Sequence, residues 1–254
     1  MVNTLNPNDP IADFTADVQA VKQRHENIQI ALKAANASGA DKKGATADYI
    51  FRVGGEFELF QHRWHIAAIS KKPSKFVASL NQTLATKVQA LPGHGIISAL
   101  GSLSLAYPAW LTAEQIETLL DESERNVTFK DVAEWKKAAS KQLDSPFDSK
   151  VAQIAQSLED TWALNLLKST RNVIAHSSKS SLKDLNTRLA PHSPTNPDGI
   201  TGSANAKLSR GVTNGVPKKV GDVSVYLHAV QGGERRADVL ADRVVAIVNK
   251  LQYP

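Results

Sequence analysis

Stretches in which apolar residues recur every three or four positions dominate this chain of 254 residues. Such spacing is typical of amphipathic helices, whose apolar side chains fall on one face. The spacing predicts a first long helix over residues 11–36 and a second over residues 46–70. Residues 38–44, which contain two glycines and two lysines, form the predicted break. The Gly54-Gly55 pair inside the second helix predicts either a kink or the close approach of another helix.

The helical periodicity is interrupted more often in the middle of the chain, over residues 71–147. Prolines and glycines divide residues 71–111, where two or three short helices are expected. The next helix is expected to open at Thr112, because Thr112 and Gln115 have the spacing of a capping box. A further helix is predicted within residues 127–143, and the sequence DSPF at residues 144–147 is expected to end it.

Residues 149–176 show the clearest helical periodicity, with no Gly or Pro, and they predict one long helix. Residues 186–222 are instead rich in Gly, Pro, Ser and Asn, and we expect a long mobile loop there. The alternation of polar and apolar residues over 222–228 predicts a short strand. Residues 234–251 predict a final amphipathic helix.

Together these elements predict an all-α single domain over residues 1–254, with four or five main helices, extra short helices and one long Gly/Pro-rich loop. The chain is long enough to bury a sizeable core, in which the four tryptophans are expected as anchors. Residues 1–10, with two prolines and three asparagines, are expected to be a flexible lead.

The net charge of +5 is unevenly placed along the chain. Residues 1–149 hold 16 Lys and Arg against 17 Asp and Glu, whereas residues 150–254 hold 14 against 8. A basic surface attracts a polyanion such as RNA by counterion release. The same balance is also found in basic proteins that have no such partner.

Several classes of protein are disfavoured by what the sequence lacks. Without cysteine, neither a disulfide nor a thiolate metal site can form. The first residues have no signal-peptide pattern and no stretch is apolar enough to span a bilayer, so we expect a cytoplasmic protein with no membrane partner. No glycine-rich phosphate loop and no nucleophile elbow is present, which argues against a nucleotide-driven motor and a serine hydrolase.

The candidate chemistry lies in the sequence RNVIAH at residues 171–176. Histidine has an ordinary pKa that suits proton transfer near neutral pH. The guanidinium group of arginine is permanently charged, and its N–H donors match the geometry of phosphate oxygens. With Asn172 to orient either group or to bind a ribose hydroxyl, Arg171 and His176 are sufficient for metal-free RNA cleavage. In that reaction the ribose 2′-OH attacks the adjacent phosphorus.

Helix geometry constrains this interpretation. Residues five positions apart lie about 140° from each other around an ideal helix, so Arg171 and His176 do not share a face. Either the helix ends or bends near Ala175, or a two-fold dimer brings two such helices into one cleft. A purely structural alternative pairs Arg171 with an acid such as Glu159 or Asp160 and makes His176 a satisfied core histidine.

The segment LLKSTRNVIAHSS at residues 166–178 resembles the R-x4-6-H motif of the HEPN superfamily, in which a polar residue usually follows the arginine. The resemblance implies a helical bundle that dimerises and, in many members, a metal-independent endoribonuclease that acts as a toxin, in phage defence or in RNA processing. It implies catalytic roles for Arg171 and His176 and a supporting role for Asn172. It also implies RNA as substrate, no cofactor, a homodimer with a composite active site, and an antitoxin or inhibitor protein as a further partner. Some members are inactive RNA- or protein-binding modules, which is the alternative.

Glu58, His62 and His65 fall on one face of the second predicted helix, which resembles the early family helix that often carries polar residues facing the cleft. A carboxylate and two imidazoles can hold a divalent metal. One helix rarely supplies a complete metal site, however, so no metal is expected. The remaining interpretations are that these residues line the same cleft as the RNVIAH motif, or that they have a surface or packing role.

Overall fold

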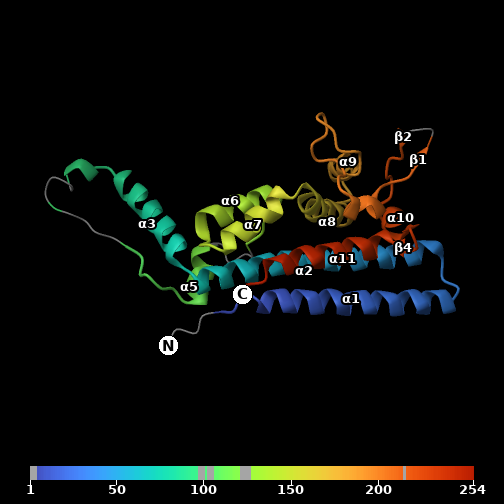
Figure 1. Ribbon diagram of the computed structural model, residues 1–254, viewed down its shortest axis with the longest axis horizontal. Helices are drawn as coiled ribbons and strands as arrows, with labels where there is room; N and C mark the ends of the chain where they lie inside the picture. The colour runs from blue at the N-terminus through green and yellow to red at the C-terminus, as the bar shows by residue number, and fades with distance from the viewer. Residues whose placement is uncertain (1–4, 97–100, 102–105, 121–126, 214–215) are drawn as a thin grey trace.

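The computed structural model describes residues 5–96, 101, 106–120, 127–213 and 216–254, and this part of the chain is mostly helical (Figure 1). Two long helices, α1 (Asp9–Ala34) and α2 (Gly39–Lys71), lie side by side along the molecule. The all-α prediction is confirmed, because the described strands are two-residue pairs in two small hairpins. None of the described helices combines the length and apolar character needed to cross a bilayer.

The remaining elements follow α2 in chain order. They are α3 (Ser74–Gln89), α5 (Ala113–Leu120), α6 (Val132–Gln142), α7 (Phe147–Gln156), α8 (Leu158–His176), α9 (Lys179–Arg188), the 3-10 helix η1 (Ser203–Leu208), the hairpin of β1 (Val212–Thr213) and β2 (Val216–Pro217), α10 (Val223–His228), the hairpin of β3 (Val230–Gln231) and β4 (Glu234–Arg235), α11 (Arg236–Val248) and the 3-10 helix η2 (Asn249–Leu251).

Helix α2 begins earlier than its periodicity predicts, because Ser38 and Asp41 form a capping box. Ser38 Oγ accepts a hydrogen bond from the Asp41 amide at 3.2 Å, and the Asp41 carboxylate accepts one from the Ser38 amide at 3.1 Å. These contacts satisfy amide groups that a helix start leaves without partners. The two lysines that follow therefore belong to the first turns of α2 and do not form a break.

The capping box predicted at Thr112 is confirmed. The Thr112 amide donates to Gln115 Oε1 at 2.9 Å, and the Gln115 amide donates to Thr112 Oγ1 at 3.2 Å. Between α2 and this point, α3 is a single helix of 16 residues, longer than the short helices expected in residues 71–111. Part of that stretch lies outside the described residues.

The prediction of one helix over residues 149–176 is wrong, because Ser157 separates α7 from α8. Its backbone is extended (φ −77°, ψ 107°), and its Oγ accepts a hydrogen bond from the Asp160 amide at 3.2 Å. A serine hydroxyl that accepts a hydrogen bond from the amide three residues later caps the start of a new helix, so α7 ends and α8 begins at this residue. The spacing of Ser157 and Asp160 is typical of a helix start, but the apolar periodicity continues through these residues and predicts a single helix.

The segment predicted as a long loop starts later than expected, since α9 continues to Arg188. Three asparagine side chains hold the described part of residues 186–222 in place through hydrogen bonds to backbone groups. Asn186 Nδ2 donates to the Val220 carbonyl at 2.8 Å, and its Oδ1 accepts from the Val220 amide at 2.8 Å. Asn196 donates to the Thr187 carbonyl at 3.0 Å, and Asn205 donates to the Glu159 carbonyl at 3.0 Å.

The short strand predicted over residues 222–228 is instead the helix α10. Asp222 is its N-cap, because one carboxylate oxygen accepts from the amides of Ser224 at 2.8 Å and Val225 at 3.4 Å. The helix buries Tyr226 and Leu227, two consecutive residues that a strand would point in opposite directions. The final helix α11 is shorter than the predicted 234–251, because Glu234 and Arg235 pair with β3 before it starts.

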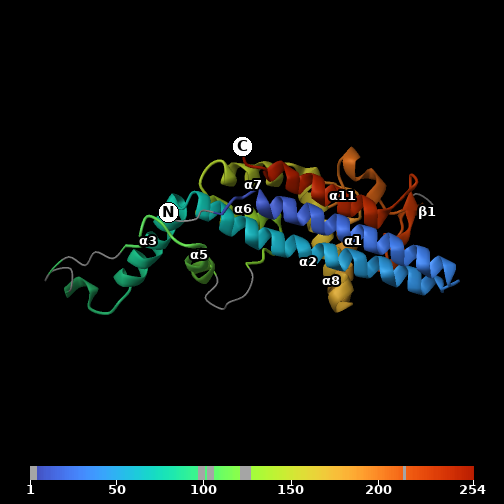
Figure 2. The same ribbon diagram turned by 90° about the horizontal axis from the view of Figure 1, so that it is seen from below.

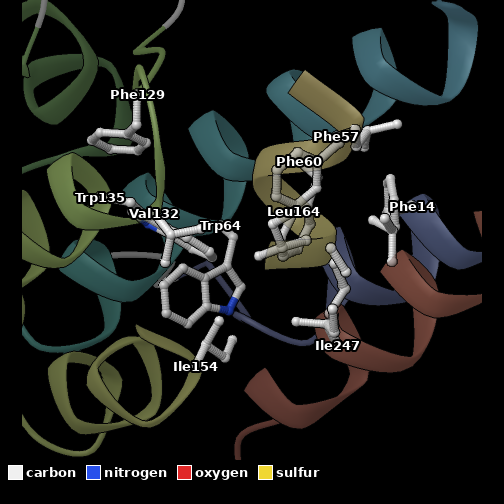
Figure 3. Packing of buried hydrophobic residues seen from close by; sticks show 14 of the residues in the cluster. Phe14, Phe57, Phe60, Trp64, Phe129, Val132, Trp135, Ile154, Leu164 and Ile247 are labelled. Atoms are coloured by element: carbon white, nitrogen blue, oxygen red, sulfur yellow. The ribbon is translucent and has the colours of Figure 1, made fainter. Parts of the chain in front are cut away.

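The core lies where α2 meets α6, α7, α8 and α11, and Figure 3 shows its aromatic centre. The rings of Trp64 and Trp135 meet edge to face at 5.9 Å, and both side chains are fully buried. Trp162 is also buried, but Trp110 is 57% exposed, so the prediction of four core tryptophans fails for Trp110. Figure 2 shows α8 crossing α2 steeply, and this crossing positions the RNVIAH motif.

Candidate functional site

Helix α8 approaches α2 closely where Arg171 passes over Gly54. A Cβ atom on Gly54 would lie 2.9 Å from Arg171 Cγ and 3.0 Å from Arg171 Cβ, so only glycine fits without a shift. Gly55 has no such neighbour. Helix α2 runs without interruption from Gly39 to Lys71. Of the two roles predicted for the glycine pair, the close approach is therefore the one observed, and it belongs to Gly54 alone.

Arg171 is held against α2 by a carboxylate and an aromatic ring. Its Nη2 lies 3.3 Å from Glu58 Oε2, and its Cζ lies 5.5 Å from the centroid of the Phe51 ring. The side chains of Arg171 and Glu58 are 28% and 25% exposed. Arg171 Nε is buried with no hydrogen-bond partner among the described residues. The guanidinium therefore retains hydrogen-bonding capacity although one end is paired.

The alternative partners considered for Arg171 are engaged elsewhere. Asp160 is buried, and its two oxygens each lie 2.6 Å from a cation, Arg243 Nη2 and Lys250 Nζ. Glu159 Oε2 lies 3.8 Å from the same Arg243 nitrogen. These contacts attach the start of α8 to α11 and η2, and they leave Glu58 as the acid that faces Arg171.

Asn172 and His176 lie on a different side of α8 and line a polar cleft of about 340 Å³ between α8 and α9. Arg171 does not line this cleft, so the divergence expected from helix geometry is observed. His176 is exposed, which rules out its interpretation as a core histidine. A larger groove, of about 830 Å³, lies between α1 and the first half of α2, but no residue of the RNVIAH motif lines it.

The cleft forms where α8 ends and α9 begins. Ser177 adopts a left-handed conformation (φ 47°, ψ 28°) that ends α8 directly after His176. Ser178 then caps α9, because its Oγ accepts from the Ser181 amide at 3.1 Å. Trp162 Nε1 donates to the Arg188 carbonyl at 2.8 Å and holds the far end of α9 against α8. The first turn of α9, whose dipole favours negative charge, thus borders the cleft beside His176.

A lysine that sequence reasoning missed, Lys168, lines the same cleft. Its Nζ donates a hydrogen bond to the carbonyl oxygen of Phe129. Burial lowers the pKa of Lys168, while the negative charges of Glu58, Asp131 and Glu134 oppose that shift. Lys168 precedes Asn172 by four positions and His176 by eight, so the helical spacing itself could have identified it.

The two acids of the cleft already have partners. Asp184 accepts hydrogen bonds from Ser169 Oγ and from Arg188 Nε, the latter at 3.2 Å. Asp131 caps α6, since its Oδ1 accepts from the Glu134 amide at 2.8 Å. These two carboxylates therefore organise the walls of the cleft, and neither forms a salt bridge with Lys130 or Lys168.

Of the three residues expected on one face of α2, only Glu58 contacts the RNVIAH motif. His62 is buried, with Nε2 3.0 Å from Glu117 Oε1 and Nδ1 accepting from the Val127 amide at 3.0 Å. His65 is fully buried, with Nε2 2.8 Å from Gln142 Oε1. The structure therefore places both histidines in packing roles that join α2 to neighbouring segments.

No protein-family model matches the chain, and no curated protein or solved structure is significantly similar to it. Within the described ranges, no group of three or more His, Cys, Asp or Glu side chains could hold a metal ion. The described cleft offers an exposed imidazole, two amides, two lysines and several serine hydroxyls, beside an arginine and two aspartates. This set suits the binding of an anion and the transfer of a proton.

Proposed function

We propose that the protein is a metal-independent endoribonuclease of the HEPN type that acts in the cytoplasm as a toxin or antiviral defence effector. The observation that carries the proposal is that Asn172 and His176 line one polar cleft with Lys130 and Lys168. The RNVIAH sequence, in which the polar residue follows Arg171, supports the same chemistry. The excess of basic residues after position 150 favours a polyanionic substrate.

The proposed reaction is a transesterification within the RNA. The 2′-oxygen forms a bond to the adjacent phosphorus and loses its proton to an imidazole, while the bond to the 5′-oxygen breaks. The leaving 5′-oxygen takes up a proton from an imidazolium, so no net proton is consumed and the products are a 2′,3′-cyclic phosphate and a 5′-hydroxyl. DNA lacks the internal nucleophile and is not a substrate. His176 is the group of this cleft best suited to the proton transfers.

The proposed site is shared between two copies of the chain. Within one copy Arg171 lies on the α2 side of α8 and His176 on the α9 side, so their side chains do not converge on one phosphate. Two copies that pair through the exposed C-terminal ends of their α8 helices would bring Arg171 of one copy to His176 of the other. An antitoxin or inhibitor that covers this region is the partner expected of such a toxin.

The proposal is tested with His176→Ala and Arg171→Ala in an RNA cleavage assay that detects cyclic phosphate ends. Loss of the proton-transferring group is expected to slow cleavage by about 10²-fold or more. Circular dichroism and thermal unfolding serve as controls for folding. If both variants cleave RNA as fast as the parent chain, the assignment of these residues is wrong.

A second candidate function is that of a catalytically inactive module that binds RNA or protein. It is favoured by one observation, the ion pair that holds Arg171 against Glu58 and away from the cleft of its own chain. Retained RNA binding without cleavage across varied RNAs would support the module. Cyclic phosphate ends that disappear with His176→Ala would support the nuclease.

A further inference from the structure

We propose that Lys168, together with Lys130, binds the RNA phosphate in this cleft, and that Arg171 of the same chain does not contact that phosphate. The inference rests on the proposed function, because it takes RNA to be the ligand. It extends that function by assigning the phosphate contact to lysines outside the RNVIAH motif.

Three side chains on one face of α8 line the cleft. Lys168, Asn172 and His176 follow each other at intervals of four residues, and all three line the cleft between α8 and α9. Such residues lie above one another on one helix face. A phosphate bound at Lys168 is therefore on the same wall of the cleft as the imidazole of His176. Arg171 is one position away from Asn172 and contacts α2 instead.

In the described cleft, the lysines form no salt bridges with the carboxylates. Asp184 is paired with Arg188, and Asp131 is engaged as the cap of α6. Among the residues that the structure describes, neither Lys130 nor Lys168 forms a salt bridge. The cleft therefore contains two ammonium groups that no described carboxylate contacts within salt-bridge distance. The negative charges of Glu58, Asp131 and Glu134 act on Lys168 from farther away, and a bound anion would supply the direct contact.

The ammonium group of Lys168 has hydrogen-bonding capacity left for a phosphate. Its ammonium group has three donors, and one of them is used by the Phe129 carbonyl. That contact directs the ammonium group and leaves two donors for phosphate oxygens. Partial burial removes much of the water that solvates the charge, so an anionic partner gains more here than at an exposed lysine.

The test compares Lys168→Met with the charge-matched control Lys183→Met. Lys183 is exposed on α9 and does not line the cleft. Binding is measured with a short single-stranded RNA carrying 2′-O-methyl groups, which cannot be cleaved because the nucleophile is blocked. Lys168→Met is expected to weaken binding about tenfold, since one charged hydrogen-bonding contact is lost. It is also expected to reduce the slope of log affinity against log salt by about 0.7, the contribution of one phosphate on a single strand.

Lys168→Arg keeps the charge and is expected to retain most of the binding, which separates a phosphate contact from a packing role. If Lys168→Met binds as tightly as the parent chain, or if Lys183→Met loses as much affinity, the inference is overturned while the proposed nuclease stands. If the parent chain binds RNA through Lys168 but never cleaves it, the inference stands and the nuclease fails. If the parent chain does not bind RNA at all, both fail.

Discussion

At the scale of single residues, burial determines what each histidine can do. His65 is fully buried beside Gln142, and its Nδ1 has no hydrogen-bond partner among the described residues. Burial lowers the pKa of His65 to about 4, the Gln142 hydrogen bond opposes that shift, and the nearby His62 adds to it. His65 is thus neutral at physiological pH and serves packing, whereas His176 is exposed and lines the cleft.

The buried His65 predicts a loss of stability on acidification. Its pKa is about 4 in the folded chain against 6.5 for the free side chain. The unfolded state therefore binds more protons between these values, and stability falls as pH falls through that window. Acidification from pH 7 to pH 5 is expected to cost about 2 kcal/mol from this residue.

Urea unfolding of the parent chain and of His65→Gln at the two pH values checks this prediction. The glutamine side chain does not titrate, so the free energy of unfolding of the variant is expected to fall less on acidification. An equal fall in both chains would show that other groups, such as the buried His25 whose pKa is also lowered to about 4, cause the acid sensitivity.

At the scale of elements, the contact between α2 and α8 decides how the motif is presented. Gly54 lets the backbone of α2 approach Arg171, and this approach places Arg171 over the Phe51 ring and beside Glu58. The next turn of α8 extends past α2 to the start of α9, where His176 meets the cleft. One helix thus presents its motif residues to two different surfaces.

The neighbouring glycines of α2 are expected to respond in opposite ways to alanine. Gly54→Ala puts a Cβ atom 2.9 Å from Arg171 Cγ, so α8 must shift, at a cost of about 1–3 kcal/mol. Gly55→Ala meets nothing within 4 Å and is expected to stabilise the helix by about 0.5–1 kcal/mol. Thermal and urea unfolding measure both changes. Equal effects of the two substitutions would mean that Gly54 is not a packing contact.

In the whole molecule, the proposed dimer would use two exposed surfaces of α8. Arg171 is partly exposed on one side of the helix and His176 is exposed at its end. The basic residues of 150–254 outnumber the acidic ones by 14 to 8, and α8, α9 and α11 all belong to this part. Two copies that join at the ends of α8 would combine these basic regions around one RNA strand.

A mixing experiment tests the shared site directly. Arg171→Ala and His176→Ala chains are each expected to be inactive alone. After the two are unfolded and refolded together, heterodimers are expected to regain part of the activity, because one of their two sites has an intact arginine and an intact histidine. No recovery, although mass measurements show heterodimers, would contradict a site composed of both chains.

Much of the fold follows from local patterns of residues. Apolar spacing predicted α1, α2, α6 and α11 to within several residues at each end, and the capping box at Thr112 placed the start of α5. The predictions were wrong where a helix cap and a pattern of apolar residues indicated different structures. The capping serine at position 157 divides a continuous apolar stretch, and Asp222 starts a helix in a segment that alternates like a strand.

The helical class, the principal helices and the residues suited to chemistry follow from the sequence, because periodicity, caps and side-chain type act over a few positions. The divergence of Arg171 and His176 also follows from the sequence, since that angle belongs to any straight helix. The packing of helices was needed to show that Glu58 and Phe51 face Arg171, that His62 and His65 are buried, and that α9 forms a cleft against the face of α8 that carries Lys168 and His176. Those outcomes depend on contacts between residues far apart in the chain, which no local pattern specifies.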